Sequence, residues 1–137
     1  MQHLLFGQSI PLAKVFDFQG EEIGGNQARI RMPYNSEFTN SRGDIHGGAI
    51  SALFDCSLAC SVRAISPLEI GVITIDMTIQ YLRSCKTDVI VLAKCDQRGR
   101  NICFARAEAF DVEGNLLATA SGTFKMVERQ VSGKLHE

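Results

Sequence analysis

The feature that most constrains the fold is one long helix in a chain whose remainder reads as strands. Residues 46–65, HGGAISALFDCSLACSVRAI, are rich in Ala, Leu and Cys, and Ser66-Pro67 follows them as a stop. At 1.5 Å per residue this helix is about 30 Å long, the diameter of a small domain. Because apolar side chains lie on nearly every side of it, the helix must be deeply enclosed.

The strands after this helix are indicated by the alternation of apolar and polar side chains. The clearest runs from Ile73 to Leu82, where an unbroken period of two predicts a strand with one apolar face. The apolar set of this strand is Ile73, Ile75, Met77, Ile79 and Tyr81. Three further strands are predicted as an antiparallel meander at 88–97, 102–112 and 116–127.

The residues before the helix are predicted to form a hairpin and a loop. Residues 13–19 and 27–32 look like paired strands, and GEEIGGN between them supplies the turn. Residues 34–45 contain Gly, Asn and Ser and have no period, so they are predicted to be a loop.

A single helix covers only part of a sheet of five to six strands, which poses a packing problem. A strongly curved antiparallel sheet wrapped around one central helix solves it, and we predict this α+β architecture. At 137 residues the chain has the length of one domain. We therefore expect one domain over residues 1–137, with 1–12 and 128–137 as terminal extensions.

Charge and cysteine content exclude several classes of function. The net charge is -1 and the charged residues are not gathered in runs, which disfavours a nucleic-acid partner. We expect no membrane span and no secretory signal, so the cytoplasm is the default location. Five cysteines without CxxC spacing indicate reduced thiols rather than disulfides or a metal site, and we expect neither metal nor cofactor.

Asp55 is the residue of the predicted helix that does not fit a purely structural role. It is the only carboxylate between residues 45 and 68, and no cation lies three or four positions away on the helix. An unpaired charge in a buried helix is costly, so the sequence must retain it for a reason. Asp55 is either a functional group or a structural one that pairs with a group from the sheet.

The start of the helix has the composition of an oxyanion site. Gly47 and Gly48 leave bare backbone N–H groups at the positive end of the helix dipole, beside His46. A tight turn that merely requires glycine is the structural alternative. Asp55 follows Gly48 by seven residues, so both lie on one helix face about 10 Å apart along the axis.

Together these residues resemble the hotdog-fold thioesterases of the PaaI-like (phenylacetic acid degradation) type. The resembling stretch begins at Asn40 with N-x-x-G-D-I-H-G-G-A-I-S-A-L-F-D. It continues after the helix with G-V-I-T-I-D-M-T-I-Q-Y-L, and the strand pattern extends to about Val127. The resemblance implies the hotdog fold and an acyl-CoA thioesterase.

The resemblance also implies roles for particular residues. Asn40 is expected to brace the active-site loop, and His46 with the Gly47 N–H to face the thioester carbonyl. Asp55 matches the catalytic acid, as nucleophile or as the base that activates water, and Thr74 stands where a hydroxyl helps to hold that water. Gly48 is expected to contact the substrate, and candidates for the phosphates of coenzyme A are Arg83, Arg98, Arg100 and Lys125.

The assembly that the resemblance implies is a homodimer with one continuous sheet, in which each site uses residues of both chains, and dimers pair into homotetramers. The acyl group stays open, because aromatic, medium-chain and hydroxylated acyls would all meet similar aliphatic walls. Two other functions also stay open. One is a non-catalytic acyl-CoA-binding or sensing domain, and the other is a hotdog dehydratase that acts on hydroxyacyl chains.

Overall fold

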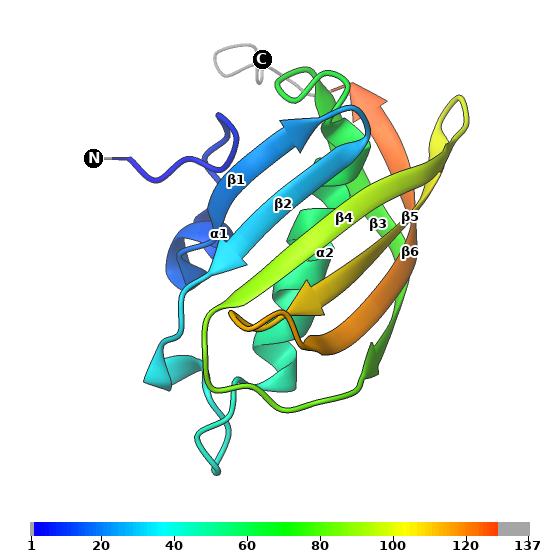
Figure 1. Ribbon diagram of the computed structural model, residues 1–137. Helices are drawn as coiled ribbons and strands as arrows, with labels where there is room; N and C mark the ends of the chain where they lie inside the picture. The colour runs from blue at the N-terminus through cyan, green and yellow to red at the C-terminus, as the bar shows by residue number, and fades with distance from the viewer. Residues whose placement is uncertain (1, 129–137) are drawn as a thin grey trace.

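The architecture is a six-stranded antiparallel sheet curved around helix α2 (Gly47–Arg63), as Figure 1 shows. The computed structural model describes residues 2–128. Along the sheet the order is β1-β2-β4-β5-β6-β3. Its strands are β1 (Gln19–Gly24), β2 (Gln27–Met32), β3 (Ile70–Tyr81), β4 (Val89–Arg98), β5 (Ile102–Phe110) and β6 (Leu116–Glu128). The predicted α+β fold, a curved sheet around one long helix, is confirmed.

The hydrophobic core lies between α2 and the inner face of the sheet, and α2 contacts all six strands. Large helix side chains such as Leu53, Phe54 and Leu58 are fully buried. Facing them are small residues of the sheet, namely Ala93, Ala105, Ala107, Ala109, Ala118 and Ala120. Small side chains let the helix approach the sheet closely, and each large side chain buried this way contributes about 1.5–3 kcal/mol. Among the described residues, none of the helices has the length and hydropathy needed to span a membrane.

The segment before α2 differs from its prediction. Residues 11–16 form a short helix, α1 (Pro11–Phe16), instead of the first half of a hairpin, because Pro11 occupies the first turn, where its missing N–H costs nothing. The hairpin is β1 with β2, so most of the predicted turn GEEIGGN is strand. Only Gly25 and Asn26 turn the chain, with φ of 58° and 68°, the conformation that a tight two-residue hairpin turn requires. The predicted loop contains one turn of 3-10 helix, η1 (Ser36–Phe38).

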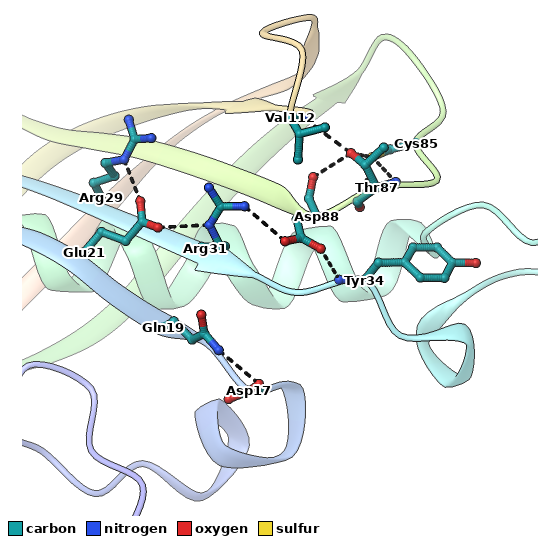
Figure 2. A network of polar contacts seen from close by, with 10 residues as sticks. All are labelled: Asp17, Gln19, Glu21, Arg29, Arg31, Tyr34, Cys85, Thr87, Asp88 and Val112. Atoms are coloured by element: carbon teal, nitrogen blue, oxygen red, sulfur yellow. Dashed lines mark hydrogen bonds and ion pairs between the residues drawn. The ribbon is translucent and has the colours of Figure 1, made fainter.

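Strand β1 is anchored by the network of charges in Figure 2. Glu21 accepts hydrogen bonds from Arg29 Nε at 2.6 Å and from Arg31 Nε at 2.9 Å. Arg31 also donates to Asp88, whose other oxygen accepts from the backbone N–H of Tyr34 at 2.7 Å. The hydrogen bond from Arg29, followed by that from Arg31, lowers the pKa of Glu21. The network therefore ties β1 to β2 and to the start of β4.

Of the two predicted terminal extensions, the structure describes the N-terminal one almost entirely and the C-terminal one only at its first residue. Leu5 is fully buried, its carbonyl accepts from Arg63 at 2.9 Å, and Gln8 donates to the carbonyl of Pro67 at 2.8 Å. The described part of the predicted extension over residues 1–12 therefore packs against the C-terminal end of α2 through Leu5 and Gln8. The extension predicted at 128–137 lies, from residue 129 onward, outside the described residues.

Strand β3 is an edge strand whose two faces exchange at a bulge. Thr74 pairs with Phe124 but Asp76 pairs with Thr123, so Ile75 is the extra residue. Thr74 consequently shares the inner face with Phe124, whereas Ile73 lies outside beside Lys125 and is 52% exposed. The prediction that the alternating residues of this strand share one face is wrong, since the bulge reverses the alternation between Thr74 and Asp76.

Candidate active site

His46 caps the N-terminus of α2, and the capping hydrogen bond fixes the orientation of its ring. Its Nδ1 accepts the backbone N–H of Gly48 at 2.8 Å. A nitrogen that accepts carries no proton, so the neutral ring has its proton on Nε2. His46 is exposed, and its Nε2–H is therefore a donor that faces away from the helix.

The two glycines after His46 play different parts. The N–H of Gly48, which we predicted would face the substrate, is occupied by His46. The N–H of Gly47 has no hydrogen-bond acceptor among the described residues. The Tyr81 hydroxyl donates to the Gly47 carbonyl at 3.0 Å, and the Tyr81 ring lies where a Cβ on residue 47 would make contact at 3.4 Å. Gly47 thus offers the free N–H. Tyr81, which the sequence did not indicate as a site residue, contacts Gly47 through its hydroxyl and its ring.

The loop before His46 is held by its own hydrogen bonds. Asn40 Oδ1 accepts from the backbone N–H groups of Arg42 at 2.9 Å and Asp44 at 3.2 Å. The His46 N–H donates to the Phe38 carbonyl at 2.8 Å. Asp44 pairs with Lys86 at 3.0 Å, and that hydrogen bond lowers the pKa of Asp44. These contacts fix the approach of the chain to the helix and so the position of His46.

Asp55 lies two turns further along α2 and is paired with the edge strand. Thr74 Oγ1 donates to Asp55 Oδ1 at 2.6 Å, a short charge-assisted hydrogen bond. The bond exists because the β3 bulge turns Thr74 toward the helix. Asp55 is half-buried rather than buried, and within the described residues no Lys, Arg or His nitrogen lies within ion-pair distance of it. The Thr74 hydroxyl is therefore the one side chain among the described residues that donates to Asp55.

The helix face that carries Asp55 is not covered by the sheet of its own chain. Gly48, Ser51, Ala52, Asp55 and Ala59 follow one another at helical spacing, and all are half-buried or exposed. Four of these five residues are small, so the face is open to a second surface. Eight residues separate Gly47 from Asp55, which is about 12 Å along the axis. Within one chain, Asp55 and Thr74 are brought together, but His46 and Gly47 are held two turns away.

The cations predicted to bind phosphate do not gather at one place. Arg98 donates to the Val62 carbonyl at 2.8 Å and to Asn26 Oδ1 at 2.7 Å, so it caps the C-terminus of α2, opposite His46. The guanidinium of Arg98 thus already forms hydrogen bonds within the fold, and its predicted contact with phosphate stays a prediction. Arg100 lies in the turn at that same end, and Lys125 is on the outer face of β6. Arg83 is exposed two residues beyond Tyr81, at the end where His46 lies.

Comparison with known proteins supplies the family context. A family model described as the thioesterase superfamily matches residues 42–118. A protein of Halobacterium salinarum that carries an esterase name is 30% identical over 77% of this chain and 78% of its own length. A Schizosaccharomyces pombe protein with an esterase name is 35% identical over 61% of this chain and 53% of its own.

Solved structures show the same fold at lower identity. A conserved protein of Pseudomonas aeruginosa has a TM-score of 0.82 and 23% identity over 86% of this chain and 94% of its own. The PaaI protein from the phenylacetic acid degradation operon of E. coli has a TM-score of 0.80 and 17% identity, over 86% of this chain and 85% of its own. The residues that the family model matches, 42–118, include α2 and β3.

Proposed function

This chain belongs to the thioesterase superfamily, and from that membership we propose that it hydrolyses the thioester bond of an acyl-CoA to a carboxylic acid and CoA. Asp55 is the catalytic carboxylate of the proposal. The observation that carries it is the 2.6 Å hydrogen bond between Thr74 and Asp55 on an open helix face. The hydroxyl of Thr74 orients this carboxylate and leaves its other oxygen, Oδ2, to act on the substrate.

The proposed chemistry divides the reaction between two groups of residues. Asp55 either attacks the carbonyl carbon directly or takes a proton from the water that attacks it. The Gly47 N–H and the His46 Nε2–H donate to the carbonyl oxygen, whose negative charge grows in the transition state. In the first route the C–S bond breaks to leave an anhydride between the acyl group and Asp55, and water then hydrolyses this anhydride to the carboxylic acid and free Asp55. In the second route the oxygen of the attacking water becomes part of the carboxylic acid as the C–S bond breaks. The sulfur leaves as the CoA thiol, with a proton from solvent or, in the second route, with the proton that Asp55 took from water. Tyr81 holds the Gly47 peptide in place.

Distance requires that these two groups come from different chains. A reacting carbonyl needs its attacking atom within about 3–3.5 Å and its oxyanion donors within about 3 Å. About 12 Å separates Gly47 from Asp55 on one helix, so one carbonyl does not reach both. We therefore propose a two-fold dimer in which His46 and Gly47 of one protomer face Asp55 of its partner.

The edge of the sheet supports this dimer. Strand β3 has 12 residues and, within residues 2–128, pairs only with β6. Ile73 and Ile75, on or beside its outer face, are 52% and 53% exposed. Antiparallel pairing of the β3 strands of two chains would join their sheets and give hydrogen-bond partners to the backbone groups along the unpaired edge. It would also place the open helix faces of the two chains opposite each other. Pairing of such dimers into homotetramers is part of the same proposal and rests on the family resemblance alone.

A subunit-complementation experiment tests the shared site. His46→Ala and Asp55→Asn proteins are each expected to be nearly inactive, with His46→Ala lowering kcat rather than raising KM. When the two are unfolded together and refolded as a mixture, half of the dimers are mixed, and each mixed dimer has one site with both residues intact. The mixture should then recover about a quarter of the parental activity. A site contained within one chain would give no recovery.

The rival functions are separated by a panel of acyl-CoAs assayed with a thiol-trapping reagent. A non-catalytic binding domain would bind members of the panel and release no thiol. A dehydratase would change the absorbance of a hydroxyacyl-CoA and leave the thioester intact. Hydrolysis of at least one member that disappears in Asp55→Asn is the expected result. The same panel would identify the acyl group.

The state of the cysteines bears on where the protein works. All five are free thiols in the structure. Because thiols stay reduced in the cytoplasm, we propose a cytoplasmic location. Fractionation of cells that produce the protein tests this, and recovery in a secreted fraction would contradict it.

A further inference from the structure

Two cysteines and a buried arginine form a cluster on the turns of α2 that follow Asp55. Cys56 and Cys60 are four residues apart and so lie on the same side of the helix. Together with Arg63 they line a cavity of about 190 Å³ between α2, the start of β3 and the N-terminal segment. Cys56 is half-buried and Cys60 is 1% exposed, so the cavity is the route from solvent to Cys60.

Arg63 places a positive charge at the closed end of this cluster. It is 3% exposed and donates to the carbonyls of Leu5 at 2.9 Å and Pro67 at 2.7 Å, and to the Cys60 sulfur at 3.6 Å. Among the described residues, no carboxylate lies within ion-pair distance of it. A buried charge without a counterion is costly. The nearest group that is able to become an anion is the Cys60 thiol.

The two sulfurs are not equivalent. The Cys56 thiol beside Cys60 lowers the pKa of Cys60, and the charge of Arg63 lowers it further against the effect of burial. The proximity of Cys60, together with burial, raises the pKa of Cys56. Burial raises the pKa of Cys95, on β4, to about 11. The contact with Arg63 therefore favours a negative charge on Cys60 over one on Cys56.

We propose that Cys56 and Cys60 are an oxidisable dithiol that reacts with small hydroperoxides. The Cys60 thiolate attacks one peroxide oxygen, the O–O bond breaks, and the sulfur loses two electrons to become a sulfenic acid. The other oxygen leaves as hydroxide from hydrogen peroxide, or as alkoxide from an organic hydroperoxide, and takes a proton to form water or an alcohol. Cys56 then attacks the Cys60 sulfur, an S–S bond forms, and the sulfenic hydroxyl leaves as water with the Cys56 proton.

Helix geometry makes the resulting disulfide a strained one. Residues four apart on a helix have Cβ atoms about 5–6 Å apart, whereas a disulfide needs about 3.5–4.5 Å. The turn from Cys56 to Cys60 must therefore deform, and the bond is easily reduced. Because Asp55 directly precedes that turn, oxidation should also slow the hydrolysis proposed above. That consequence rests on the proposed function, whereas the thiol chemistry does not.

Mass spectrometry of the full-length protein after hydrogen peroxide treatment tests the proposal. Residues 43–63, which trypsin releases as one peptide, should lose two hydrogen masses at least roughly tenfold faster than the peptides with Cys85, Cys95 and Cys103 react. Dithiothreitol should restore the original mass. In Cys56→Ser the same peptide should instead gain one oxygen on Cys60, because no thiol remains to close the bond. Cys60→Ser should remove the fast reaction.

Several results would overturn the proposal. Oxidation of the 43–63 peptide no faster than that of the other three cysteines would show that this peptide has no especially reactive thiolate. A stable single-oxygen adduct on Cys60 in the parent protein would show that the disulfide does not form. Fast reaction that persists in Cys60→Ser would place the reactive sulfur elsewhere. Each readout is independent of acyl-CoA turnover, so an inactive protein would still answer the question.

Discussion

At the scale of the residue, the candidate site depends on which hydrogen bonds are already made within the fold. Gly48 and Arg98 have donors that are consumed internally, by His46 and by the end of α2. Gly47 keeps a free N–H, and Asp55 has one hydroxyl partner. Residues whose hydrogen-bonding groups are not already bonded within the fold are those able to act on a substrate. A donor that already bonds within the fold must give up that bond first.

Asp55→Asn is expected to fold normally and to lose turnover by orders of magnitude. The amide keeps the shape of the side chain and an oxygen that still accepts from Thr74, but it neither attacks a carbonyl nor takes a proton from water. Thermal melting at pH 7 and acyl-CoA hydrolysis on the same preparation check this. A well-folded variant with near-parental hydrolysis would remove Asp55 from the mechanism, and a poorly folded one would favour a structural role.

Thr74→Val removes the hydroxyl that orients Asp55 and keeps the volume of the side chain. We expect kcat to fall by about tenfold to a hundredfold, because a misoriented base or nucleophile loses much of its advantage. Thr74→Ser is the matched control, since it retains the donor, and should stay within a few-fold of the parent. Equal activity in the valine and serine variants would show that the 2.6 Å bond has no part in turnover.

At the scale of the element, the β3 bulge is what brings strand and helix into contact at the site. It turns Thr74 inward and leaves Met77 opposite Gly122. A Cβ on residue 122 would lie 2.8 Å from the Asp76 carbonyl oxygen and 2.9 Å from the Phe124 ring. The bulge therefore fits only against a residue without a side chain.

Gly122→Ala is expected to destabilise the protein by about 1–3 kcal/mol, the usual cost of forcing atoms into a packed site. The backbone at Asp76 has to move, and because the bulge sets Thr74, turnover should fall as well. Denaturant unfolding measures the first effect. Ser121→Ala, at an exposed neighbouring position, serves as the control and should be close to neutral. Unchanged stability in Gly122→Ala would show that the bulge tolerates a side chain.

The Glu21 network on β1 and β2 should make stability depend on pH. The pKa of Glu21 is lowered in the folded state, so its contribution is present above the unfolded pKa of about 4.3 and is lost as pH falls below it. We expect Glu21→Gln to be less stable than the parent by about 1 kcal/mol or less at pH 7. That difference should narrow below the unfolded pKa of about 4.3 and close as pH falls through the lowered folded-state pKa of Glu21. A difference that is constant across this range would mean that the charge of Glu21 contributes nothing.

At the scale of the whole molecule, two neighbouring surfaces of the chain are those that the proposed partner chain would cover. The open face of α2 and the unpaired edge of β3 adjoin each other, because the Asp55–Thr74 bond links them. A partner placed along β3 therefore also covers the helix face. The proposed dimer would therefore form the proposed active site at the same time.

Ile75→Lys should dissociate the dimer, since a charged side chain at the bulge of an edge strand opposes pairing with another strand. We expect light scattering to give the mass of one chain at micromolar concentration, with hydrolysis lost and the circular dichroism of the fold retained. Leu92→Lys, an equally apolar-to-charged change at an exposed position of the central strand β4, is the matched control. A stable monomer with parental activity would contradict the shared site.

The sequence by itself determined most of the elements and named the residues of the proposed site, and the tertiary structure decided how they meet. Period and length are local properties, so α2, β3 and the meander β4 to β6 were predictable. The sequence also placed Asp55 on α2 and His46 and Gly47 at its start. The start of β1 was not predictable, because a polar Gly-rich segment becomes a strand only when Arg29 and Arg31 on β2 pair with Glu21.

The same distinction holds for the parts of the site that the sequence missed. A bulge depends on the register against a partner strand, and so the inward turn of Thr74 follows from β6 rather than from β3 itself. The use of Arg98 as a helix cap depends on where the β4–β5 hairpin folds back over α2. Sequence periodicity carries information about which way each side chain points within its own element, whereas these contacts join residues 19 to 72 positions apart and exist only once the elements are packed.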